Sequence, residues 1–130
     1  MLEIGLSSGV REDWFPTSIW YFDLPDHDVV NRHLSAVIQA ERVGDPSGMS
    51  ERSSALGWHS NDDLHLRDDF MPLLSWIESC IAEVTTFQKW DLDKVKPMIT
   101  NCWANVNDNG ASNVVHNHPQ SSFSGVYYVQ

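Results

Sequence analysis

Residues 113–130, N-V-V-H-N-H-P-Q-S-S-F-S-G-V-Y-Y-V-Q, decide how the rest of the chain is interpreted. His116 and His118 stand two residues apart behind a pair of β-branched valines. In a strand, residues i and i+2 point to the same face, so both imidazoles would project together toward one metal ion. Pro119 ends this predicted strand because it has no N–H to donate. Residues 125–129 predict a second strand directly afterwards.

Upstream of this stretch, the sequence predicts two amphipathic helices followed by strands. Apolar residues recur at helical spacing from Val30 to Ile38 and again from Phe70 to Val84. We therefore predict an α+β fold in which the helices pack against an antiparallel sheet. The expected elements are a strand over 18–24, a helix from Asp26 or Asp28 to Arg42, a helix over about 70–89 capped by Asp68 or Asp69, and strands over 98–106, 114–118 and 125–129, with a hairpin turn at Asn109-Gly110.

The composition fits one domain over residues 1–130, with 42% hydrophobic residues. The 18 acidic and 8 basic residues give a net charge of −10, which repels nucleic acid and anionic membranes. No apolar run is long enough to span a membrane, and the first residues lack the features of a signal peptide. With Cys80 and Cys102 expected as free thiols, we predict a cytoplasmic protein that binds neither nucleic acid nor membrane.

The histidines differ in how strongly their surroundings indicate a metal. His116 and His118 lie on a predicted strand that is followed by a proline and small polar residues, which favours a metal role over half-exposed side chains bonded to neighbours. His27 and His33 fit solvated helix positions. His59 is open, because it lies in an irregular loop whose Trp58 we expect to be buried; we likewise expect Trp103 in the core.

Four stretches of the chain match a known family in order: F-P-T-S-I-W at 15–20, S-x-x-x-G-W-x-S from Ser53 or Ser54 to Ser60, W-A-N-V at 103–106, and H-N-H-P-Q-S-S-F-S-G-V-Y-Y-V at 116–129. On these residues the chain resembles the Fe(II)/2-oxoglutarate oxygenases, in a group of short proteins similar to the prolyl-hydroxylase branch. The last stretch is long enough to be specific. The resemblance covers nearly the whole chain.

The resemblance implies a double-stranded β-helix, or jelly roll, with the helices packed on its outer sheet. It also implies Fe(II) held by His116 and His118 together with a carboxylate, and 2-oxoglutarate as co-substrate. The wider superfamily carries Asp or Glu where this chain has His118, so the carboxylate is unassigned and a three-histidine site is an alternative. We expect co-substrate contacts from Asn105 and from Tyr127 or Tyr128, of which at most one points inward.

A complete jelly roll needs eight strands, and only about three strand signals follow Pro97. The distal histidine and the basic residue that holds 2-oxoglutarate are expected further downstream. We therefore expect a partial jelly roll, the N-terminal portion of an oxygenase with its C-terminal strands missing. Such a chain should bind Fe(II) weakly and should not turn over 2-oxoglutarate, which a succinate assay would test. The primary substrate, a small molecule or a peptidyl side chain, is not indicated.

Two other classes compete with an oxygenase. Gly110, His116 and His118 have the spacing of a cupin metal motif, but Ser122 or Phe123 stands where that motif has Glu. A cupin-like metal-binding protein would still be a jelly roll. The second alternative is a non-catalytic interaction module. Open sheet edges invite pairing, so we also expect a possible homodimer, which a measurement of solution mass would reveal.

Overall fold

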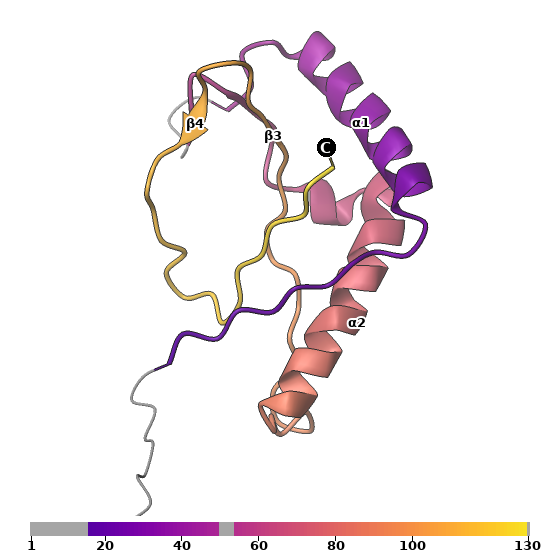
Figure 1. Ribbon diagram of the computed structural model, residues 1–130, viewed down its shortest axis with the longest axis vertical. Helices are drawn as coiled ribbons and strands as arrows, with labels where there is room; N and C mark the ends of the chain where they lie inside the picture. Colours follow the sequence, from indigo (N-terminus) through magenta and orange to yellow (C-terminus); the bar gives the residue numbers. More distant parts are fainter. Residues whose placement is uncertain (1–15, 50–53, 130) are drawn as a thin grey trace, which may run out of the picture.

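The computed structural model describes residues 16–49 and 54–129, and it has two long helices and a few short strands. Phe15 and Ser53, quoted above, and Gln130 lie outside the described residues. The two helices follow one another along one flank, with their N-terminal ends near each other, and the extended segments run along the other flank (Figure 1). The predicted α+β class is confirmed. The elements are α1 (His27–Gly44), β1 (Ser54–Ala55), β2 (Trp58–His59), the 3₁₀ turns η1 (Leu64–Leu66) and η2 (Asp68–Phe70), α2 (Met71–Phe87), β3 (Asn105–Val106) and β4 (Ser112–Asn113).

Helix α1 lies within two residues of its predicted bounds, because its apolar stripe is a local signal. Leu34 is 2% exposed, and Val30, Val37 and Ile38 pack around the same core. The predicted cap is wrong at Asp26, which stands at the N-cap position in a left-handed conformation (φ 54°) and makes no side-chain cap. A left-handed residue does not aim its side chain at the first free N–H groups, so the helix begins without that bond.

Helix α2 supplies the opposite wall of the core. Leu73, Leu74 and Val84 are buried along one face, and Leu73 and Leu74 join a cluster with Leu34, Leu64 and Phe70. Pro72 sits in the first turn, where its missing N–H costs nothing. Asp68 and Asp69 do not cap α2 as predicted, because they form the separate turn η2 immediately before it.

Residues 18–24 do not form the predicted strand. The segment crosses α2 in extended form (Figure 1). Trp20 meets Phe87 edge-to-face at 6.3 Å between ring centroids, and Leu24 packs against the core. A strand needs a hydrogen-bonding neighbour, and here the aromatic side chains pack on a helix instead.

The short strands form two antiparallel pairs between residues 54–59 and 105–113. Trp58 pairs with Val106 in one, and Ala55 pairs with Ser112 in the other. The turn at Asn109-Gly110 is present, since the Ala111 N–H donates to the Asp108 carbonyl at 2.9 Å. The predicted hairpin is wrong, however, because β3 and β4 pair with β2 and β1 rather than with each other.

The last part of the chain is extended but has no ladder partner among the described residues. Residues 114–118 and 125–129 are therefore not the strands that the sequence predicts. The first of these segments bows outward along the flank away from the helices, and the second returns between the helices and the strand pairs (Figure 1). Tyr127 and Val129 pack against the core on this return. A jelly roll remains an expectation from the resemblance.

Candidate metal centre

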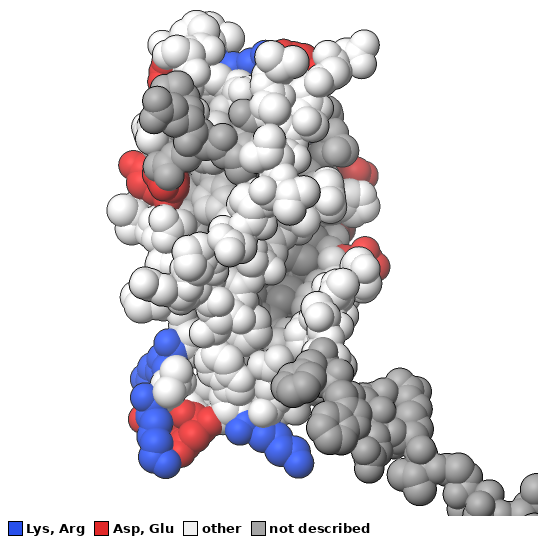
Figure 2. Space-filling view, turned by 90° about the vertical axis from the view of Figure 1, so that its left-hand side faces the viewer, with Lys and Arg blue, Asp and Glu red and all other residues white. Residues whose placement is uncertain are grey.

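His116 and His118 lie next to each other, with ring centroids 4.8 Å apart and planes at 77°. Their backbone is extended without being a paired strand. His116 is exposed and His118 is partly buried. The flank on which residues 114–122 run is largely free of charged side chains, which gather at its lower end and its edges (Figure 2). The two imidazoles are thus close together on a flank whose middle shows few charged side chains (Figure 2).

The tautomer of His116 is set by its own backbone. Its Nδ1 lies 2.8 Å from the Val114 carbonyl oxygen. A carbonyl can only accept, so Nδ1 carries the hydrogen and Nε2 presents its lone pair outward. This is the arrangement that metal-bound histidines commonly have, with the other ring nitrogen donating to a carbonyl.

The side chain of His118 contacts two aromatic rings, those of Trp103 and His116. Its ring lies 5.6 Å from that of Trp103, at an angle of 33°. The other side of Trp103 stacks on His59 at 5.6 Å and 14°. His59 is 4% exposed, and its Nδ1 lies 2.5 Å from the Ser60 carbonyl. The sequence analysis missed this role of His59 because its contact with Trp103 joins distant parts of the chain.

The predicted co-substrate residues lie in three different settings. Asn105 is in β3, paired with His59 of β2, and its side chain is exposed. Tyr128 is 75% exposed. Tyr127 faces the helices, where its hydroxyl donates to Asn31 Oδ1 at 2.6 Å. Burial raises the pKa of this phenol. The structure therefore joins Tyr127 to α1, while the roles of Asn105 and Tyr128 stay predictions.

Among the residues that the structure describes, no third metal ligand accompanies the two imidazoles. Across residues 16–49 and 54–129, no group of three or more His, Cys, Asp and Glu side chains could hold a metal ion. Asp108, in the loop between β3 and β4, is bound to Arg42 of α1. That hydrogen bond and charge lower the pKa of Asp108. The site thus offers two nitrogen donors, which fit part of a ferrous centre.

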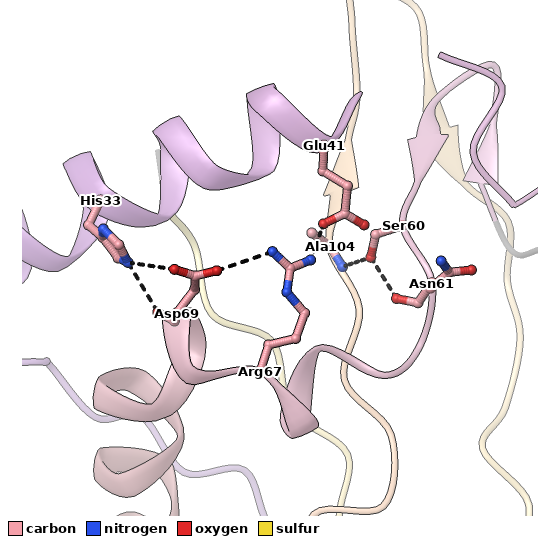
Figure 3. A network of polar contacts seen from close by, with 7 residues as sticks. All are labelled: His33, Glu41, Ser60, Asn61, Arg67, Asp69 and Ala104. Atoms are coloured by element: carbon pink, nitrogen blue, oxygen red, sulfur yellow. Dashed lines mark hydrogen bonds and ion pairs between the residues drawn. The ribbon is translucent and has the colours of Figure 1, made fainter. Parts of the chain in front are cut away.

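A separate polar network stabilises the helical side (Figure 3). His33 Nε2 lies 3.2 Å from the Asp69 carbonyl oxygen, and Arg67 bridges Asp69 and Glu41. These contacts join α1 to η2. His33 is predicted at a solvated helix position; its side chain is exposed but is bonded to Asp69. His27 is exposed and lies beside Asp28.

A family model described as "Putative 2OG-Fe(II) oxygenase" matches residues 101–130, which include Trp103, His116 and His118. The match covers 30 of the 130 residues and supports the broad family for this segment. No curated protein and no solved structure matches the chain. In the described part of the chain, no helix is both long and apolar enough to cross a membrane.

Proposed function

We propose that the protein is an Fe(II)- and 2-oxoglutarate-dependent dioxygenase in which His116 and His118 are iron ligands. The observation that carries the proposal is the approach of these two rings to 4.8 Å inside the segment that matches the oxygenase family. Imidazole is a ligand that suits ferrous iron. When bound, iron and 2-oxoglutarate would activate O₂, with one oxygen atom going to the hydroxylated primary substrate and the other to succinate as 2-oxoglutarate loses CO₂.

His116 and His118 would hold the metal in different ways. His116 would bind through Nε2, because Nδ1 is committed to the Val114 carbonyl. His118 would bind from a ring that is already oriented by Trp103. Asn105 and Tyr128 are the candidates for contacts with 2-oxoglutarate, since Tyr127 is bonded to Asn31. The carboxylate ligand and the primary substrate, a small molecule or a peptidyl group, are left unassigned.

Anaerobic titration of the purified chain with Fe(II) tests the proposal. We expect His116→Ala and His118→Ala each to weaken binding by about tenfold or more, the scale on which a metal site responds to lost support. His27→Ala is the matched control, because His27 is an exposed histidine on α1. Unchanged binding in the double variant of His116 and His118 would refute the proposal.

The response to 2-oxoglutarate separates an oxygenase from a cupin-like metal-binding protein. In an oxygenase, the keto acid chelates the iron and produces a visible charge-transfer absorption. We expect this absorption in the wild-type protein and its loss in the double histidine variant. Metal binding that is indifferent to 2-oxoglutarate would favour the cupin-like alternative.

A further inference from the structure

We infer that Trp103 is a positioning residue that fixes the ring of His118 by standing between it and the buried ring of His59. This inference rests on the proposed function, because the stack affects metal binding only if His118 is a metal ligand. Three rings lie in sequence from the interior to the surface: His59, Trp103 and His118. His116 then meets His118 edge-to-face at the outer end.

The backbone of Trp103 is held on both sides. Cys102 donates to the Asp62 carbonyl at 3.0 Å and accepts from the Leu64 N–H at 3.1 Å. Ala104 donates to Ser60 Oγ at 2.9 Å and accepts from the Ser60 N–H at 3.0 Å. The bond between Ala104 and Ser60 is visible in Figure 3. The indole of Trp103 therefore projects from a backbone segment whose two neighbouring residues, Cys102 and Ala104, are both hydrogen-bonded.

The side chain of Trp103 faces away from the helical core. Cys102 and Ala104 pack against the core cluster, and successive side chains of an extended segment alternate between faces. Trp103 consequently points to the flank where His118 lies, and its ring contacts are the two imidazoles.

The inner imidazole makes the stack rigid. His59 belongs to β2, is almost completely buried, and is bonded through Nδ1 to the Ser60 carbonyl. Its plane is within 14° of the indole at 5.6 Å between ring centroids, so the two rings pack in an offset stack. His118 lacks a ladder partner for its extended segment, and the indole supplies the fixed surface instead. The two proposed ligands are thus oriented differently. The ring of His118 packs on Trp103, whereas the ring of His116 is bonded to the nearby Val114 carbonyl.

Metal binding by the full chain tests this role with Ni(II) or Co(II) as the probe. We expect Trp103→Leu to weaken binding by about tenfold, as losses of support around a ligand commonly do. Trp103→Phe keeps a flat aromatic ring against His118 and should bind within about threefold of the wild type. Trp76→Phe, a partly buried tryptophan on α2, is the control for a general change in packing. Equal affinity in Trp103→Leu and the wild type would overturn the inference.

A second measurement covers the case in which Trp103→Leu does not fold. Either metal should quench the fluorescence of the nearest indole on binding. We expect Trp103→Phe to bind the metal yet lose most of this quenching, while Trp76→Phe keeps it. Unchanged quenching in Trp103→Phe would show that Trp103 is remote from the metal, which also overturns the inference.

The ring signals of His118 in the metal-free protein separate this inference from the proposed function. Stacking on an indole shifts carbon-bound ring protons upfield, and we expect Trp103→Leu to remove that shift while Trp76→Phe does not. If the shift is present but no metal binds to the wild type, the stack stands and the oxygenase proposal fails. If metal binds through both histidines but the shift is absent, the proposed function stands and the inference fails.

Discussion

Leu34 provides the sharpest test of how the helical half is built. Its side chain is 2% exposed and lies in the cluster that joins α1, η1 and α2. Leu34→Ala removes about three buried carbons, each of which contributes about 0.8 kcal/mol on burial, or about 2.4 kcal/mol together. The cavity left behind adds to this loss, and buried Leu→Ala changes cost about 2–5 kcal/mol. We therefore expect the free energy of unfolding to fall by about 3 kcal/mol.

Urea denaturation followed by circular dichroism measures this change. With an m-value of about 2 kcal/mol/M, a loss of about 3 kcal/mol lowers the midpoint by about 1.5 M. Val43→Ala is the matched control, because Val43 lies on the same helix and is 79% exposed. The control should change stability by less than about 0.5 kcal/mol. Equal losses in the two variants would refute the placement of Leu34 at the centre of the core.

Two further predictions concern the loops around the strand pairs. Gly48→Ala should lower the unfolding free energy by more than about 1 kcal/mol, because φ is +54° and a Cβ would lie 2.5 Å from the His59 carbonyl oxygen. Gly44→Ala is the control and should not lower it, because a Cβ there would meet nothing within 4 Å. Similar urea midpoints for the two variants would contradict this prediction. The folded pKa of Asp108 is lowered by Arg42, so its stabilisation is present above the ordinary value of 3.8 and is lost as the pH falls through the folded value. Asp108→Asn should therefore flatten the loss of stability measured on acidification, and identical pH profiles would show that this ion pair has no effect.

The helices could be predicted from the sequence because their signal is local. The spacing of Val30, Leu34, Val37 and Ile38 predicts which face of α1 is buried, and the structure places those side chains at the core. The caps were harder to predict, since a single backbone angle at Asp26 decides whether its side chain reaches the helix. Such an angle depends on how the preceding segment approaches, which the local sequence does not contain.

The strands could not be predicted correctly because pairing is not local. The pattern over 98–106 indicates extended backbone, but it does not name a partner, and the turn at Asn109-Gly110 favours the nearest one. In the structure the partner is the 54–59 segment, whose register is set where buried Trp58 pairs with Val106. The spacing of His116 and His118 predicted neighbouring rings from strand geometry. The rings are neighbours, but on an unpaired segment that is supported by Trp103.

Three of the four stretches that carry the resemblance meet in space. His59, Trp103 and His118 come from three separate stretches, and the pairing of β2 with β3 brings the first two together so that the third can stack on them. His59 occupies a variable position of its stretch, written x in S-x-x-x-G-W-x-S, whereas Trp103 and His118 are among the quoted letters. The matched letters alone therefore do not contain the inner ring of the stack, which only the fold places against Trp103. A site built in this way gains its precision from a contact between distant segments, which is why a motif of two histidines alone does not specify it.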